Sequence, residues 1–167
     1  IGSFLGVHSS RRAFLETVVT HLDGTPRLKI WAPSSNSLAF RSPLRRSYVG
    51  QAWGRDMFEI LNRSKLTLNH HGDIFPSANN MRLFEATGVG TLLITDWKPN
   101  LHEMFLPGKE VIAYRTPQEC AELVRYYLAH EDERRAIACA GQARTLGEHT
   151  YYQRTQELVG IVGKLLS

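Results

Sequence analysis

Short apolar runs alternate with helical stretches along most of this chain, and this alternation limits the possible folds more than any other feature. The expected strands cover residues 1–7, 27–32, 65–69, 91–95 and 110–114, and the expected helices cover 9–22, 54–61, a short stretch after Asn80, 101–104, 117–129, 131–146 and 150–166. Strands joined through helices usually lie parallel, with helices on both faces. We therefore predict an α/β domain with a doubly wound parallel sheet and a C-terminal helical segment.

Local signals mark the boundaries between these elements. Thr116 and Pro117 are a typical helix start, with a capping side chain followed by proline at the first position. We expect Gly147 to end the helix that begins at 131, and residues 33–50, rich in Ser, Pro and Arg, to form a long surface loop. The charged run 131–135 is expected to be a solvated helix face.

The composition fits one ordinary globular domain with a sizeable core. The chain has 167 residues, of which 43% are apolar and 22% charged. No apolar run reaches the ~20 residues of a membrane span, and there is no signal-peptide pattern. Cys120 and Cys139 lack metal-ligand spacing, which predicts two small core residues in a reduced, cytoplasmic protein. Because the sequence starts within an apolar run and without Met, we expect it to be the C-terminal part of a longer protein.

Positive charge is concentrated in the first part of the chain. Residues 1–63 hold nine Lys and Arg against four Asp and Glu, a balance of +5, whereas residues 64–167 hold eleven against twelve, a balance of −1. The basic residues are dispersed and no nucleic-acid-binding motif is present, which argues against a nucleic-acid partner. A small anionic ligand fits this distribution better.

Ligands of doubly wound sheets bind beyond the carboxyl ends of the strands, which directs attention to loops 6–12, 70–80 and 95–100. The first loop contains Gly6, which permits close backbone approach, and His8, Arg11 and Arg12. It leads into a helix N-terminus, where free N–H groups favour anions, and arginine matches phosphate oxygens. We predict a phosphate-binding loop, with Arg11 favoured over Arg12.

Residues 79–96 contain the second candidate site. Asn79, Asn80 and Met81 lead into a short helix that carries Arg82 and a lone acid, Glu85. A helix start suits phosphate, and a carboxylate within the first turns can accept hydrogen bonds from sugar hydroxyls. The arrangement suits a nucleoside diphosphate, although an ordinary helix–loop–strand connection with a solvated glutamate explains these residues equally well.

Other chemistries have little support in the sequence. The G-x-G-x-x-G spacing of nicotinamide dinucleotide folds is absent, and no nucleophile-elbow motif surrounds a serine. His70 and His71 are adjacent and have no second ligand cluster, so we predict no metal site and no cofactor. Their loop is more plausibly part of a substrate cleft, with His71 or Asp73 near a sugar.

Four segments resemble the C-terminal nucleotide-sugar-binding domain of GT-B glycosyltransferases (group 1), nearest to the CgeB-like branch. They are FLGVHSSRR, YVGQAWGRDMFEILNRSKLTLN, NMRLFEATGVGTLL and EHTYYQRTQELV, in the order and spacing of the family. The resemblance covers nearly the whole chain. It implies one Rossmann-like donor-binding domain over residues 1–167, with an N-terminal acceptor domain elsewhere in a longer protein.

The resemblance also implies roles for individual residues. Arg11 stands at the lysine position of the family's phosphate loop and would stabilise the leaving diphosphate, while Glu85 stands at the glutamate that holds the ribose hydroxyls. Many retaining members carry a second glutamate eight residues earlier, where this chain has Ser77. Sugar-facing contacts would then come from Ser77, His71, Asp73 or the backbone around residues 78–80.

The leading hypothesis is therefore the donor half of a metal-independent glycosyltransferase that binds a nucleotide sugar and is inactive without its other domain. Its acceptor would be a saccharide or another molecule held by that domain. One alternative is a non-catalytic nucleotide-binding or regulatory module, which the serine at position 77 favours. A related third hypothesis is an epimerase of GT-B architecture.

Overall fold

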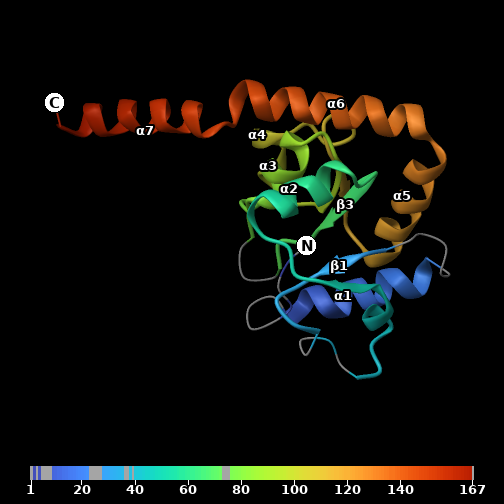
Figure 1. The fold of residues 1–167 in the computed structure, drawn as a ribbon. Coiled ribbons are helices and arrows are strands. Elements are labelled where there is room, and N and C mark those ends of the chain that lie inside the picture. The colour runs from blue at the N-terminus through green and yellow to red at the C-terminus, as the bar shows by residue number, and fades with distance from the viewer. Residues whose placement is uncertain are drawn as a thin grey trace.

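The structure, a computed structural model, describes residues 2, 4, 9–22, 28–35, 38, 40–72 and 76–166 (Figure 1). Its strands are β1 (Ile30–Trp31), β2 (Tyr48–Gly50), β3 (Leu66–Asn69), β4 (Leu92–Asp96) and β5 (Ile112–Tyr114). Its helices are α1 (Ser9–His21), the 3-10 helix η3 (Pro43–Ser47), α2 (Gly54–Asn62), α3 (Arg82–Gly88), α4 (Leu101–Met104), α5 (Pro117–Ala129), α6 (Glu131–Glu148) and α7 (Tyr151–Leu166).

All described strands pair in parallel, as the alternating pattern predicts. One sheet has the order β3-β4-β5, with Leu66 opposite Leu92 and Ile94 opposite Ile112. β1 and β2 form a second, two-stranded parallel sheet. The α/β class with parallel sheets is confirmed. The strand expected at 1–7 lies outside the described residues except for Gly2 and Phe4, and the N–H of Gly2 donates to the carbonyl of Trp31.

The central strand β4 is buried on both faces, which is why its first three residues are all apolar rather than alternating with polar ones. Leu92 and Ile94 point into a core that α1 and α5 cover, and Leu93 points into a second core under α2, α3 and α4. Helix α6 lies across both layers, since Ile137 joins the first core while other positions of the helix contact α3.

Helix boundaries follow local capping chemistry where a capping residue is present. The Thr116 side chain accepts a hydrogen bond from the N–H of Glu119, and Pro117 occupies the first position of α5, as predicted. Gly147 does not end α6, which continues to Glu148, so that expectation is wrong. The surrounding helix-forming residues and the packing of α6 outweigh the single glycine.

The expected surface loop over 33–50 is also wrong, because it contains η3 and β2. Ser42 caps η3 by accepting from the N–H of Leu44, whose side chain is fully buried, and Pro43 occupies the first turn. Strand β2 has only three residues and is half-exposed, so it carries no alternation that a sequence pattern could reveal.

Two expectations about side-chain burial are corrected. Cys120 is buried, and burial raises the pKa of its thiol to about 12, whereas Cys139 is exposed on α6 rather than in the core. Arg134 is not a solvated residue of the charged run: it is 8% exposed and donates to the carbonyl of Lys65 at 2.7 Å. Its ion pair with Glu131, 2.7 Å between Nη2 and Oε1, compensates that burial.

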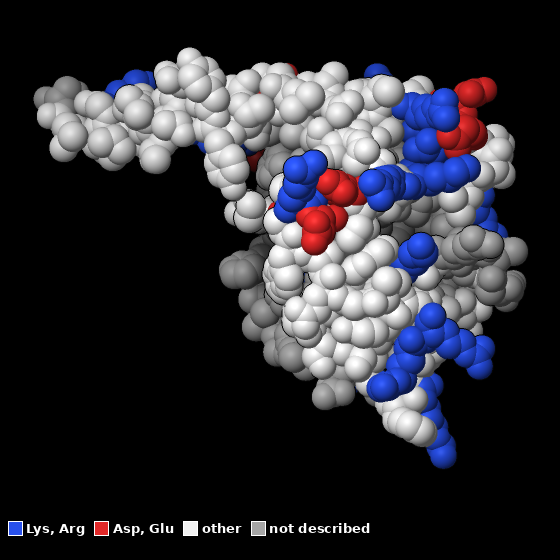
Figure 2. Space-filling model, in the orientation of Figure 1, with Lys and Arg blue, Asp and Glu red and all other residues white. Residues whose placement is uncertain are grey.

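The charge asymmetry of the sequence appears on the surface. On the face shown in Figure 2, acidic residues lie only over the upper half of the molecule, and the lower half carries basic residues alone. That lower half contains α1 and β1 (Figure 1), in the part of the sequence with the positive balance. Among the described residues, no helix is long and apolar enough to cross a bilayer.

Candidate functional site: the carboxyl edge of the sheet

The last residues of three parallel strands meet at one edge of the sheet. In this register Asn69 of β3 lies opposite Thr95, and Asp96 of β4 lies opposite Tyr114 of β5. Asn69 donates from Nδ2 to Oγ1 of Thr95 at 3.0 Å. Strand parallelism alone therefore brings an amide, a carboxylate and a phenol together at the edge where ligands of such sheets bind.

Asp96 is the centre of this edge. Its Oδ1 accepts from the backbone N–H of His71 at 2.9 Å and contacts Nδ1 of the same residue at 2.6 Å. Its Oδ2 lies 3.6 Å from Nζ of Lys98 and 3.8 Å from Nδ1 of His70. Burial alone would raise the pKa of Asp96, but the hydrogen bonds and charges of His71, with a contribution from His70, hold it below its ordinary value.

Arg11 reaches the edge from the first turn of α1. Its Nε donates to the carbonyl of His70 at 2.8 Å. Partial burial lowers the pKa of the guanidinium, the nearby Asp96 carboxylate opposes that shift, and Arg82 adds to it. Asp96 and the His70 carbonyl thus hold the cation in place, and an arginine remains charged under all physiological conditions.

A stack of rings packs α1 against the same edge of the sheet. Phe14, one helical turn further along α1, stacks on His70 with centroids 4.7 Å apart and on Tyr114 at 5.0 Å. The Tyr114 hydroxyl donates to the carbonyl of Asn69 at 2.6 Å, and burial raises the pKa of this phenol.

Paired amides hold the turn before α3. Asn80 and Asn69 bond through both side chains, at 2.9 and 3.3 Å. Asn100 accepts from the N–H of Ala78 at 2.7 Å and donates to its carbonyl at 3.0 Å. The segment from 78 to 80 is therefore fixed against the ends of β3 and β4.

The helix expected after Asn80 begins at Arg82, has seven residues and lacks a side-chain cap. Nη1 of Arg82 pairs with Oε2 of Glu85 at 3.0 Å, and both side chains are largely buried. Burial lowers the pKa of Arg82, and Glu85 opposes that shift. Glu85 is thus an ion-paired, largely buried acid rather than the solvated glutamate of the alternative explanation.

The predicted residues fall into three groups in the structure. Arg11, Asn80, Met81, Arg82 and Glu85 all line one cavity of about 1430 Å³, which extends along β3 toward β1 and α2. The residues Arg12, Asn79, His71 and Ser77 do not line it, and Asn79 and Ser77 are exposed. The remaining three, Gly6, His8 and Asp73, lie outside the described residues.

Sequence reasoning did not single out Asp96, Lys98 or Tyr114 as site residues. Their one sequence signal is position, because each lies at or just after the end of an apolar strand. Lys98 joins the loops after β3 and β4, because its Nζ lies 3.6 Å from the carboxylate of Asp96 and donates to the carbonyl of Gly72 at 3.3 Å. In the part of the chain that the structure describes, no group of three or more His, Cys, Asp or Glu residues is arranged to hold a metal ion.

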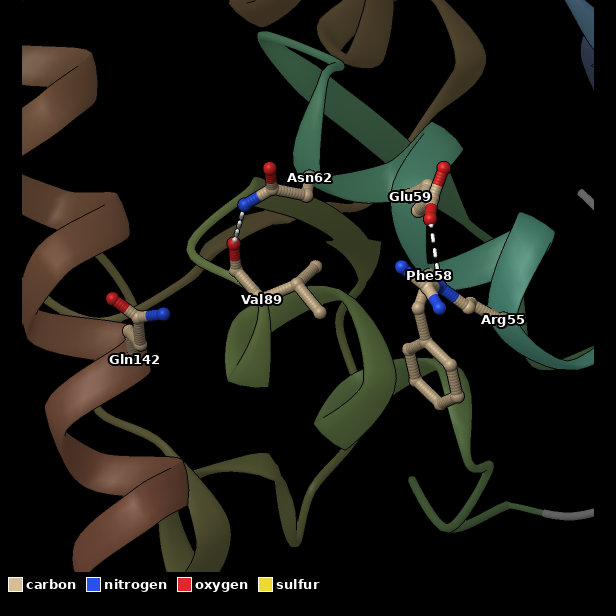
Figure 3. Close-up of a pocket in the computed structure, with 6 residues that line it drawn as sticks. All are labelled: Arg55, Phe58, Glu59, Asn62, Val89 and Gln142. Atoms are coloured by element: carbon tan, nitrogen blue, oxygen red, sulfur yellow. Dashed lines mark hydrogen bonds and ion pairs between the residues drawn. The ribbon is translucent and has the colours of Figure 1, made fainter.

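A second hollow of about 450 Å³ lies beside the residues that precede β3 and β4 (Figure 3). Arg55 and Glu59 of α2 form an exposed ion pair there, and Asn62 donates to the carbonyl of Val89. This hollow is at the amino edge of the sheet, away from Asp96 and Arg11, and it contains no buried charge. We assign it no role.

Fold and edge together define a parallel α/β domain with cationic side chains gathered at the carboxyl edge of its sheet. The sequence profile of the glycosyl transferase-like family matches residues 11–160. The chain belongs to this family. No curated protein matches the chain in sequence.

Solved glycosyltransferase structures share the fold at low sequence identity. HepE of Anabaena, crystallised with UDP, superposes with a TM-score of 0.73 at 13% identity, over 98% of this chain and 48% of its own. The C-terminal domain of the group 1 glycosyl transferase LpcC from Francisella tularensis superposes with a TM-score of 0.64 at 12% sequence identity, and the match covers 90% of this chain and 84% of that domain. Sucrose-phosphate synthase of Thermosynechococcus elongatus superposes with a TM-score of 0.71 at 16% sequence identity, and the match covers 99% of this chain and 45% of the synthase.

These likenesses show that the fold is the Rossmann-like domain of GT-B glycosyltransferases. The chain spans about half the length of HepE and of the synthase.

Proposed function

We propose that this chain is the donor-binding domain of a glycosyltransferase that moves a sugar from a nucleoside diphosphate to an acceptor. The observation that carries this proposal is the cavity along β3, whose lining includes Arg11, Arg82, Asn80 and Glu85. Two partly buried guanidinium groups favour a ligand with concentrated negative charge, and a diphosphate has it. Membership of the glycosyl transferase-like family supports the same assignment.

Arg11 would bind the diphosphate and stabilise it as the leaving group. In the transfer step the bond between the anomeric carbon and the phosphate oxygen breaks, and the electron pair stays on that oxygen. Arg11 is fixed through the His70 carbonyl before the ligand arrives, so little reorganisation is needed as this charge develops. The acceptor hydroxyl forms the new bond to the anomeric carbon and gives up its proton.

Glu85 would hold the ribose. Its Oε2 is engaged by Arg82, and that ion pair orients the carboxylate so that Oε1 can accept hydrogen bonds from ribose hydroxyls. Anchoring the ribose positions the diphosphate against Arg11 and thereby the anomeric carbon for attack.

We propose further that the reaction needs no metal, with arginine taking the electrostatic role of a cation. The acceptor site and any catalytic base would belong to a second, N-terminal domain, so this chain alone would bind donor but transfer no sugar. Its span of about half of HepE supports that organisation. The segment EHTYYQRTQELV favours the CgeB-like branch, and the two free thiols favour a cytoplasmic location.

Calorimetric titration with UDP, GDP and their glucose and mannose conjugates tests the donor site, and the HepE complexes with UDP and UDP-glucose make the uridine ligands the first choice. Removing a charge-assisted contact costs about 1.5–3 kcal/mol, so we expect Arg11→Ala and Glu85→Ala to weaken binding by about tenfold or more. Arg12→Ala is the matched control, since Arg12 is the next residue of α1 and does not line the cavity.

Absence of binding by every nucleotide would contradict the donor site. Equal losses in Arg11→Ala and Arg12→Ala would indicate only a general charge effect rather than a defined phosphate contact.

A non-catalytic nucleotide-binding or regulatory module is the second candidate. Ser77 favours it, because this residue is exposed, does not line the cavity and cannot supply the carboxylate that many family members place there. An assay of nucleoside diphosphate release by the longer protein distinguishes the transferase from the binding module. A transferase would release nucleoside diphosphate only when an acceptor is present, whereas a binding module would bind the nucleotide sugar and leave it intact.

A further inference from the structure

Two large apolar side chains line the cavity along β3 and have no role in the proposed diphosphate and ribose contacts. Trp53 is 65% exposed and Met81 is 60% exposed, and both line the cavity together with Arg11 and Glu85. An indole that is mostly open to water presents two broad apolar faces, and aromatic walls of this kind are typical of small-molecule sites.

Trp53 and Met81 occupy equivalent places on two neighbouring helices. Trp53 is the N-cap residue of α2, and Met81 is the N-cap residue of α3. Helix α2 leads into β3 and α3 leads into β4, and these two strands pair in parallel. Both helices therefore begin at the carboxyl edge of the sheet and run toward its amino edge.

The far ends of the two helices fix their alignment. Nδ2 of Asn62, the last residue of α2, donates to the carbonyl of Val89, the C-cap residue of α3, at 2.8 Å. Trp53 lies nine residues before Asn62, and Met81 lies eight residues before Val89. At a rise of about 1.5 Å per residue, Trp53 and Met81 differ in height by only about 1.5 Å. Met57, one turn into α2, packs against the core cluster to which α3 contributes.

This alignment suits a flat ligand group between the two helix starts. Packed helix axes are about 8–10 Å apart, and a flat ring needs about 7–8 Å between the groups that contact its two faces. Nε1 of Trp53 donates to Oε1 of Gln51 at 3.4 Å, and Nε2 of Gln51 donates to the carbonyl of Pro33 at 2.7 Å. Gln51 thereby orients the indole by its edge.

Glu85 places a nucleoside beside these two side chains. Its N–H donates to the carbonyl of Met81 at 2.9 Å, so the two residues are one helical turn apart. Side chains of a helix lean toward its N-terminus, which brings the Glu85 carboxylate back toward the start of α3. A ribose held there is bonded directly to its base, and the base is then the part of the ligand that reaches Trp53 and Met81.

We propose that the nucleobase of the donor stacks on the Trp53 indole, with the Met81 thioether against its other face. This inference rests on the proposed donor site and assigns a place to the remaining part of the nucleotide. Every base has a π-face, and a thioether adapts its shape to what it contacts, so this contact supplies affinity for purines and pyrimidines alike. Gln51 is a positioning residue that acts through Trp53.

Calorimetric titration with UDP, GDP and inorganic pyrophosphate tests the base contact, because pyrophosphate carries the charge without a base. We expect Trp53→Ala to weaken nucleotide binding about tenfold while pyrophosphate binding stays within about twofold. Trp53→Phe keeps a stacking ring and should recover most of the loss, whereas Trp53→Leu keeps only apolar bulk and should not. Trp97→Ala is the matched control, since Trp97 follows β4 at the same edge, is 40% exposed and does not line the cavity.

Unchanged nucleotide binding in Trp53→Ala would overturn the inference, and so would equal losses of nucleotide and pyrophosphate or full recovery in Trp53→Leu. The donor site is tested separately by Arg11→Ala, which should weaken the binding of nucleotide and pyrophosphate together. If the unaltered chain binds none of the three ligands, the donor site fails and the inference falls with it.

Tryptophan fluorescence gives a second readout, because a stacked base quenches the emission of an indole. We expect UDP or GDP to quench the emission of the unaltered chain, and pyrophosphate to leave it unchanged. Trp53→Phe should remove most of the quenching by nucleotide, whereas Trp97→Phe should retain it. Quenching of the same size in Trp53→Phe as in the unaltered chain would place the base elsewhere and contradict the proposal.

Discussion

At the scale of a single residue, Gly141 shows how closely α6 approaches the sheet. A Cβ at this position would overlap the carbonyl oxygen of Glu110 and touch the side chain of Thr87. Because the first of these atoms belongs to the backbone, it cannot rotate away. We expect Gly141→Ala to lower the free energy of unfolding by about 1–3 kcal/mol in urea denaturation, the usual cost of overpacking.

Gly147 is the matched control because it lies in the same helix. A Cβ there meets no atom within 4 Å, and no positive φ forbids a side chain. Gly147→Ala should therefore raise the free energy of unfolding by about 0.5–1 kcal/mol through the lower backbone entropy of the unfolded chain. A similar loss in both variants would show that α6 tolerates no substitution of glycine, rather than that Gly141 marks a close contact.

At the scale of the element, segments with a local sequence signal could be predicted, whereas β2 and η3, which lack one, could not. Strand β4 and helix α5 were predicted within a residue or two because an apolar run and a capped start are local signals. Strand β2 and η3 were missed because their stability comes from contacts distant in sequence, such as the pairing of β2 with β1. Burial of Arg134 likewise depends on the Lys65 carbonyl, 69 residues away.

Helix α7 is the one long element among those described that has no buried residue. It extends away from the body of the molecule in Figure 1, and its apolar side chains are exposed, among them Leu158 at 60% and Leu165 at 80%. A helix of this length without tertiary packing is only marginally stable in water. We expect hydrogen exchange of the 167-residue chain to show little protection over residues 151–166 and strong protection over α6.

The contrast between α6 and α7 serves as the internal control, since both helices belong to one chain under one set of conditions. Protection of α7 equal to that of α6 at micromolar concentration would mean that another surface covers its apolar side chains in solution. Protection that falls on dilution would identify that surface as a second copy of the chain.

At the scale of the whole molecule, parallel topology explains why part of the site could be predicted. Any parallel sheet brings the loops after its strands to one edge, so Arg11, Asn80 and Glu85 could be expected together without knowledge of the register. The pairing of His71 with Asp96 could not, because it requires the exact register of β3 against β4. One residue of slippage would turn either side chain to the opposite face.

The same pair links stability to pH. The folded-state pKa of Asp96 lies below its ordinary value, because the hydrogen bonds and charge of His71 outweigh burial, so the unfolded chain binds a proton more readily. The resulting stabilisation is present above the unfolded pKa of about 4 and is lost as the pH falls through the folded pKa. In urea denaturation between pH 2 and 7, Asp96→Asn should be less stable than the unaltered chain at neutral pH, and the difference should shrink in acid. Asp132→Asn, at an exposed position, should show a smaller gap. A gap for Asp96→Asn that stays constant to pH 2 would contradict this linkage.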